Sequence, residues 1–201
     1  MESLNSIQME MTQPIDLMTP SNHLLVALPQ LSDPYFSQSI TLLCEHNDTG
    51  ALGLVVNRPS DNTLGDMLKQ LGLPCPEHLE HRKVYNGGPV GLERGFVLHT
   101  DQSEWRNTID LRADGSLKLT TSRDIIEAIG NDAGPDQFML VFGYAGWAAG
   151  QLEQEMDKNA WITTQIGQDL LFNTPPEDRW HKAINSLGFN MSQLSPEVGH
   201  C

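Results

Sequence analysis

The sequence predicts an α+β fold, because its strand patterns come in hairpins and its helix patterns stand between them. One hairpin is predicted over residues 39–57, where two apolar runs flank the turn-forming residues 46–50. A second is predicted where strands at 108–111 and 116–119 flank Ala113-Asp114-Gly115. Strand and helix do not alternate strictly, so an entirely parallel sheet is not expected.

The other elements follow from apolar periodicity and from the residues that begin or end a helix. Arg58-Pro59 is expected to end the first hairpin, because proline cannot continue a central strand. Further strands are predicted at 24–28, 84–85, 95–100 and 160–163. Helices or helical turns are predicted at 35–38, 64–71, 122–130, 168–171 and 177–187.

Residues 138–156, FMLVFGYAGWAAGQLEQEM, form the most distinctive stretch of the chain. An apolar run at 138–142 predicts a buried strand, and glycines at 143, 146 and 150 predict a turn. Helical spacing follows Trp147, so we expect a strand, a glycine turn and a helix that begins near Gly146 and Trp147. The stretch has neither the lysine of a P-loop nor the dinucleotide-binding glycine spacing. Close packing around Trp147 is the main interpretation, and an anion or small-ligand site at the helix start is the alternative.

The composition is that of a globular protein, with 39% apolar and 19% charged residues in a chain of 201. We expect a flexible N-terminal extension at 1–20, with some order near 15–18, a single domain at 21–189 and a C-terminal tail at 190–201. No apolar stretch reaches the length of a transmembrane helix, and the first twenty residues lack a secretory signal pattern. A cytoplasmic protein is therefore expected.

The charge balance disfavours two classes of partner. With 12 basic and 26 acidic residues the formal net charge is −14, and the basic residues are scattered. The charge disfavours direct nucleic-acid binding, since such binding needs several aligned cations, and it disfavours membrane-surface binding likewise. The three cysteines are widely spaced, which predicts reduced thiols and no disulfide framework.

Two short motifs could form a ligand site. Asn57-Arg58 ends a predicted strand, and the Arg58 guanidinium could clamp a carboxylate or a phosphate. An arginine in such a place more often pairs with a nearby acid. Gly87-Gly88 belongs to a tight turn whose bare backbone could also approach a ligand.

Two further clusters contain residue types that are used in nucleophilic catalysis or in metal binding. Cys44 and His46 should share a strand face, but adjacent residues of one strand rarely reach the geometry of a nucleophile and its base. Cys75, His78 and His81 form a C-x2-H-x2-H pattern without a fourth ligand, so no metal site is predicted. We expect no cofactor and no catalytic residue, although whether the protein is an enzyme stays open.

Five blocks make the chain resemble the AlgH/YqgE family of bacterial proteins. They are LLVALPQLSDPYFSQSITLLCEH at 24–46, GALGLVVNRP at 50–59, YNGGPVGLERGFVLH at 85–99, FGYAGWAAGQLEQEM at 142–156 and PPEDRWHKAINSLG at 175–188. The resemblance implies a bifurcated, mixed and largely antiparallel sheet, folded as a pseudo-barrel with flanking helices. It also implies a link to the regulation of alginate synthesis, which suggests a transcriptional role, but no activity.

We therefore expect a binding or regulatory protein without a conventional catalytic site, acting through an unknown protein or small-molecule partner. The alternative is an enzyme that acts on a small anionic metabolite in a cleft near Arg58 and 143–147. A transcriptional regulator is the third hypothesis, disfavoured as a direct DNA binder by the net charge. The hypothetical ligand-binding residues are Asn57, Arg58, Gly87, Gly88, Tyr144, Gly146 and Trp147.

Overall fold

The computed structural model describes residues 23–100, 102–165 and 167–188. The predicted extension at 1–20, the order expected near 15–18, and the tail at 190–201 lie outside these residues. The strands are β1 His23–Ala27, β2 Ile40–Asn47, β3 Gly50–Val55, β4 Pro59–Thr63, β5 Lys83–Asn86, β6 Val90–His99, β7 Thr108–Asp110, β8 Lys118–Thr120, β9 Phe138–Ala148 and β10 Trp161–Gln165. The helices are α1 Leu64–Gln70, α2 Arg123–Gly130, α3 Gln151–Asp157, α4 Gln168–Phe172 and α5 Pro176–Ser186, with a 3₁₀ turn at Glu77–Leu79.

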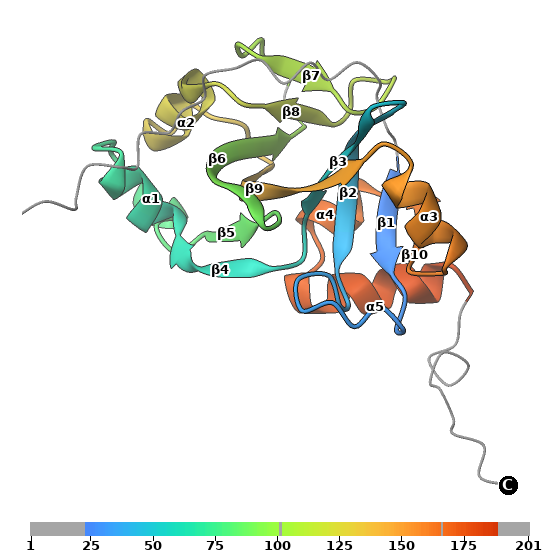
Figure 1. Ribbon diagram of the computed structural model, residues 1–201. Helices are drawn as coiled ribbons and strands as arrows, with labels where there is room; N and C mark the ends of the chain where they lie inside the picture. Colours follow the sequence, from blue (N-terminus) through green and yellow to red (C-terminus); the bar gives the residue numbers. More distant parts are fainter. Residues whose placement is uncertain (1–22, 101, 166, 189–201) are drawn as a thin grey trace, which may run out of the picture.

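The described strands form one curled sheet in the order β10-β1-β2-β3-β9-β6-β8-β7. A short branch leaves it, because β5 pairs with β9 as well as with β4. The β5–β9 pair is parallel and the other pairs are antiparallel. Figure 1 shows the sheet wrapped as an open barrel with α1 and α2 at one side and α3 and α5 at the other. The predicted α+β fold and its bifurcated, largely antiparallel sheet are confirmed.

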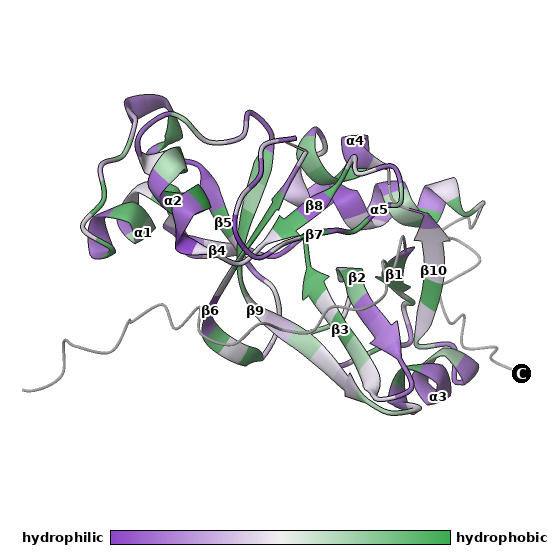
Figure 2. Ribbon diagram, turned by 90° about the horizontal axis from the view of Figure 1, so that it is seen from above, coloured by the Kyte–Doolittle hydropathy of each residue, from purple (hydrophilic) through white to green (hydrophobic). Residues whose placement is uncertain are grey.

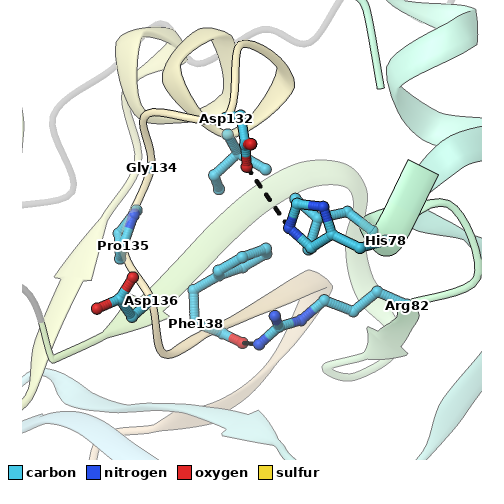
Figure 3. Close-up of a pocket in the computed structure, with 9 residues that line it drawn as sticks. His78, Arg82, Asp132, Gly134, Pro135, Asp136 and Phe138 are labelled. Carbon is cyan, nitrogen blue, oxygen red and sulfur yellow. Dashed lines mark hydrogen bonds and ion pairs between the residues drawn. The ribbon is translucent and has the colours of Figure 1, made fainter. Parts of the chain in front are cut away.

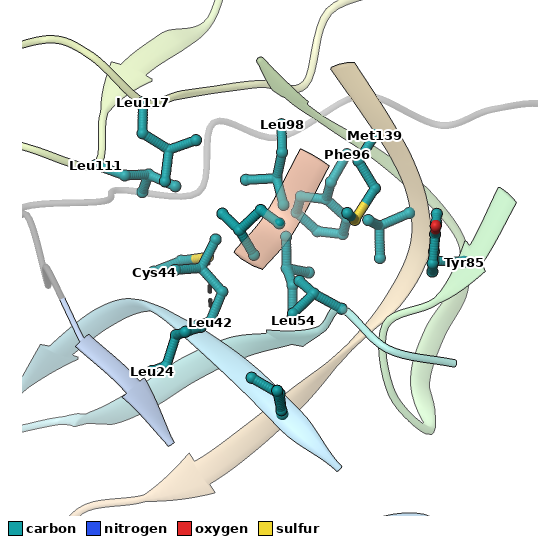
Figure 4. Close-up of a cluster of buried hydrophobic side chains, with 14 of the residues drawn as sticks. Leu24, Leu42, Cys44, Leu54, Tyr85, Phe96, Leu98, Leu111, Leu117 and Met139 are labelled. Atoms are coloured by element: carbon teal, nitrogen blue, oxygen red, sulfur yellow. Dashed lines mark hydrogen bonds between the residues drawn. The ribbon is translucent and has the colours of Figure 1, made fainter. Parts of the chain in front are cut away.

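Hydrophobic side chains gather in three clusters around this sheet. The largest lies inside the curl, where strand residues such as Leu42, Leu54 and Phe96 meet Trp180 of α5. Figure 4 shows its centre, with Leu98 and Met139 facing Leu42 across the barrel. The second cluster packs α1 and α2 on the outer face, and the third packs α3 on β1, β2, β9 and β10. Figure 2 shows that helices such as α2 and α3 carry both hydrophobic and hydrophilic residues.

Strand β9 takes part in all three clusters, because its inward face changes at Gly143. Met139 and Val141 point into the barrel, whereas Ala145 and Trp147 belong to the cluster under α3. Strict alternation would keep all four odd-numbered residues on one face. Gly143 has φ +71° and the β6–β9 register shifts there, which is the behaviour of a β-bulge.

Both predicted hairpins are confirmed, and one predicted boundary is wrong. Residues 40–55 pair as β2 and β3, and β7 pairs with β8. The first hairpin ends before Arg58-Pro59, as expected, and Pro59 then opens the separate strand β4, at a position where a strand tolerates proline. The strand predicted at 138–142 continues to Ala148, and α3 begins at Gln151. No helix among the described residues is long and apolar enough to cross a membrane.

Candidate functional site

Asn57 and Arg58 line a cavity of about 280 Å³ between the end of β3 and the start of α5. The other wall comes from α5, through Pro176, Glu177, Trp180 and His181, and Ser37 and Gln38 close it from the loop before β2. Asn57 holds that loop, because its Oδ1 accepts from the N–H of Ile40 and its Nδ2 donates to the carbonyl of Gln38. Asn57 therefore has a structural role, whereas Arg58 has a hydrogen-bond donor that remains without a partner among the described residues.

Arg58 lacks the acidic partner that an arginine at a strand end usually has. Its Nη2 donates to the carbonyl of Ser37 at 2.5 Å, and among the described residues no carboxylate forms an ion pair with it. Its Nε is shielded from solvent and has no hydrogen-bond partner. A buried donor without a partner costs free energy, so such groups are as a rule satisfied by protein, water or ligand. The expected pairing with an acid is thus wrong.

Two other features add positive potential beside Arg58. Arg179 of α5 is buried, and its guanidinium donates to the carbonyl of Val56, to that of Thr174 at 2.9 Å and to the Tyr85 hydroxyl at 3.3 Å. Helix α5 also begins at this cavity without a side-chain cap. The N-terminal end of a helix carries partial positive charge, and Glu177 in the first turn offsets it.

Gly87 and Gly88 do not offer their backbone to a ligand, because β3 and β9 occupy it. Gly87 donates to the carbonyl of Phe142 at 2.7 Å and accepts from the N–H of Val55 at 2.8 Å. A Cβ on Gly87 would lie 2.2 Å from the carbonyl oxygen of Gly143. These glycines therefore build the branch point of the sheet. The preceding Tyr85 and Asn86 line a separate cavity of about 360 Å³ beside β4.

Tyr144, Gly146 and Trp147 lie in β9 and line no part of the Arg58 cavity. The ring of Tyr144 packs edge to face against Phe96, with centroids 6.2 Å apart. Gly146 is exposed within the strand, so the expected helix start at Gly146 and Trp147 is wrong. Of the seven residues predicted as a ligand site, Gly87, Gly88 and Tyr144 thus meet in backbone contact at the branch of the sheet, and Gly146 and Trp147 lie further along β9. Of the seven, only Asn57 and Arg58 line the Arg58 cavity.

Trp147 is the packing anchor that its sequence context indicated. Its Nε1 and that of Trp161 both donate to Oε2 of Glu155, at 2.9 and 2.8 Å. The two indole rings meet edge to face, 6.0 Å between centroids. The other oxygen of Glu155 accepts from Gln151. One carboxylate thus fastens α3 to β9 and β10.

Cys44 and His46 cannot act together as nucleophile and base. A bulge between Leu43 and Glu45 breaks the alternation of β2, so the expectation that both side chains share a face is wrong. Cys44 lies in the barrel interior, where burial raises the pKa of its thiol far above the ordinary value. The ring of His46 instead contacts Oε1 of Glu153 in α3 at 2.5 Å.

The C-x2-H-x2-H loop does not assemble around a metal position. Cys75 packs against the cluster under α1 and α2, while His78 forms an ion pair with Asp132, 3.5 Å from Nε2 to Oδ1. Within residues 23–100, 102–165 and 167–188, no group of three His, Cys, Asp or Glu side chains is placed to hold a metal. His78 and Asp132 border a third cavity, of about 180 Å³ (Figure 3).

The comparisons with known proteins agree with this fold. The family model of AlgH-like proteins matches residues 24–192. The chain belongs to the AlgH-like family. A UPF0301 protein of Idiomarina loihiensis is 51% identical over 181 residues, covering 89% of this chain and 97% of the relative. The solution structure of the AlgH protein from Pseudomonas aeruginosa is 44% identical, with a TM-score of 0.73 over 90% of this chain and 95% of that one.

A second solved structure has a similar fold although its sequence identity is low. The crystal structure of protein DIP2367 from Corynebacterium diphtheriae has a TM-score of 0.63 at 20% identity, covering 84% of this chain and 87% of that one. At this identity the likeness shows the fold alone. The family resemblance drawn from the five sequence blocks is confirmed, and these matches indicate no catalytic function.

Sequence patterns missed the α5 side of the Arg58 cavity. Trp180 and His181 follow Arg58 by more than 120 positions, and no local pattern links the two segments. Pro175-Pro176 correctly signalled the start of a helix. That this helix would begin beside Arg58 depends on the curl of the sheet, which a local pattern does not encode.

Proposed function

We propose that the protein is a binding protein without a catalytic site, and that it takes a small anionic ligand in the Arg58 cavity. The observation that carries the proposal is the state of Arg58: a guanidinium with a shielded, unpartnered Nε and no carboxylate partner among the described residues. A carboxylate or phosphate oxygen can satisfy guanidinium donors in charge-assisted bonds.

The cavity also favours a small ligand over a macromolecule. At about 280 Å³ it lies just below the usual range for drug-sized ligands, roughly 300–1,000 Å³. Trp180 supplies an apolar wall and Glu177 a competing carboxylate. A monoanion with a compact apolar body fits this combination better than a highly charged phosphate ester, because the charge of Glu177 would repel additional negative charge.

We propose a cytoplasmic location as part of this function. The two cysteines that the structure describes, Cys44 and Cys75, are both free thiols. Unpaired cysteines are typical of the reducing cytosol.

The proposal is tested by NMR titration of the ¹⁵N-labelled protein with acetate, pyruvate, succinate and inorganic phosphate, with sodium chloride as the ionic-strength control. We expect at least one anion to cause saturable shifts at Gln38, Asn57 and His181. Arg58→Met should weaken that binding by about tenfold or more, the cost of losing hydrogen bonds to a charged group. Glu177→Gln should tighten it, because a competing negative charge is removed.

Two controls separate binding from folding. Arg106→Met removes an exposed arginine that lines no part of this cavity, and its binding should equal that of the wild type. Arg58→Lys keeps the charge that holds the Ser37 loop but loses the planar fork, so it should fold normally and bind less tightly. The proposal fails if no anion gives a saturable response, or if Arg58→Met binds as well as the wild type.

A further inference from the structure

The cavity bordered by His78 and Asp132, independent of the Arg58 site, lies between the C-terminal end of α2 and the start of β9 (Figure 3). Its volume is about 180 Å³. Charged side chains of both signs border it, namely Arg82, Asp132 and Asp136. Leu79, Ile129, Pro135 and Phe138 supply the apolar part of its wall.

Asp132 occupies a backbone position at which a negatively charged side chain is unfavourable for stability. It follows the C-cap Asn131 of α2 and has φ +59°, in the left-handed region that favours glycine. Its N–H donates to the carbonyl of Ile129, and that of Ala133 donates to Ala128, which together form a Schellman motif. A negative charge there also meets the negative end of the helix dipole.

The other helix ends of this kind avoid that cost. Helices α1 and α5 place Gly72 and Gly188 at the equivalent left-handed position, and α3 places Asn159 there. Among these four helices, α2 alone carries a charge at this position. Backbone strain that persists beside a cavity is often retained because the side chain has a function. Its carboxylate and the carbonyl end of α2 give this side of the cavity a negative potential.

Arg82 gives the opposite side a positive charge. Its guanidinium stacks on the Phe138 ring, 3.9 Å from Cζ to the centroid, and Nη2 donates to the Phe138 carbonyl at 2.6 Å. Among the described residues no carboxylate pairs with Arg82. Burial lowers the pKa of this guanidinium, and a bound anion would counter that effect. In the view of Figure 3, Asp132 and the Arg82 guanidinium lie on opposite sides of the Phe138 ring.

From this placement we propose that the cavity binds a zwitterion, namely a free α-amino acid with a small apolar side chain. Arg82 takes the carboxylate, Asp132 takes the ammonium in place of its contact with His78, and the apolar wall takes the side chain. A simple anion would be repelled by the two aspartates, and a simple cation would leave Arg82 unpaired. The volume of about 180 Å³ suits a ligand of this size better than a larger metabolite.

The direct test uses three probes that differ by one group. L-valine carries both charges, isovalerate lacks the ammonium and isobutylamine lacks the carboxylate. NMR titration of the ¹⁵N-labelled protein should show saturable shifts at His78, Asp132 and Phe138 with L-valine, and at least tenfold weaker responses with the two single-charge analogues. The other proteinogenic amino acids are titrated alongside, since the side chain that fits best is to be found by comparison.

Asp132→Gly separates function from folding, because it should lose binding while becoming more stable. Glycine relieves the left-handed strain and removes the charge, so Tm should rise by about 2–4 °C. Asn159→Gly is the matched control, since it makes the same change at the Schellman position of α3 and should raise Tm without changing binding. Arg82→Lys should fold and bind at least tenfold more weakly, because it loses the planar fork.

The proposal is overturned if none of the amino acids gives a saturable response at this cavity. It is also overturned if isovalerate binds as tightly as L-valine, or if Asp132→Gly binds like the wild type. None of these outcomes bears on the Arg58 site, whose readout comes from Gln38, Asn57 and His181.

Discussion

At the scale of single residues, three glycines at the branch of the sheet act through backbone contact. Gly87 and Gly88 cross Gly143 and Tyr144 so closely that a Cβ on either glycine would lie 2.2 Å from a backbone atom. Gly143 in turn would place a Cβ 2.6 Å from the carbonyl oxygen of Gly88. The sequence of the block YNGGP predicts a turn. In the structure its glycines allow three strands to approach one another closely.

Gly87→Ala is therefore expected to destabilise the protein by about 3 kcal/mol, because the new methyl group meets backbone that cannot move aside. Gly150 has φ +72° but open space around it, so Gly150→Ala should lower the free energy of unfolding by about 1–2 kcal/mol through backbone strain alone. Gly167→Ala has neither problem and should stay within about 0.5 kcal/mol of the wild type. Urea unfolding followed by circular dichroism measures all three; equal losses would refute the backbone-contact explanation.

Residue types alone could suggest Arg58 but could not describe its surroundings. The end of a strand and a lone cation were visible in the sequence, and in the structure β3 ends at Val55, shortly before Arg58. The missing acidic partner was not visible, since it depends on which distant segments fold against the strand end. Arg179 illustrates the same limit, because a helix-face pattern gives no sign that a buried guanidinium will donate to the carbonyl of Val56, just after β3, and to that of Thr174, in the loop before α5.

At the scale of elements, α3 depends on the contacts of one carboxylate, because the helix itself is short. The helix has seven residues, of which Leu152 is buried, and a helix this short is marginal without tertiary contacts. Glu155 accepts both indole N–H groups of Trp147 and Trp161. Removing it would leave two donors in a largely apolar cluster without partners.

Glu155→Ala is expected to lower the free energy of unfolding by about 1.5–3 kcal/mol, the range for hydrogen bonds to a charged group. Glu155→Gln should lose less, because its amide oxygen still accepts from the indoles. Gln154→Ala, on the exposed side of the same helix, is the control and should change little. Chemical denaturation with tryptophan fluorescence gives the comparison, and a Glu155→Ala variant as stable as Gln154→Ala would contradict this account.

Elements with a regular pattern were predictable, and their irregularities were not. Both hairpins and helices α1, α2 and α5 follow from apolar spacing and turn residues. Three deviations come from backbone geometry: the bulge in β2, the turn of β9 at Gly143, and the pairing of β4 from Pro59 onward. Each breaks the period of two on which strand prediction depends, and each occurs where the sheet curls or branches.

At the scale of the whole molecule, β9 connects the three hydrophobic clusters. It gives Met139 and Val141 to the interior, Phe138 and Leu140 to the cluster under α1 and α2, and Trp147 to the cluster under α3. On one edge it pairs with β6, and on the other with β5 and then β3. Separating any cluster from the others would require breaking this central strand.

The predicted single domain should therefore unfold in one cooperative transition. In a urea titration followed by NMR, the native amide signals of Leu68 in α1, Leu152 in α3 and Ile184 in α5 should disappear with one midpoint, because each residue represents a different cluster. A lower midpoint for Leu68 alone would show that α1 and α2 form a separate unit. The variant Gly87→Ala should move all three midpoints together, since the branch point that it disturbs lies on the strand that the clusters share.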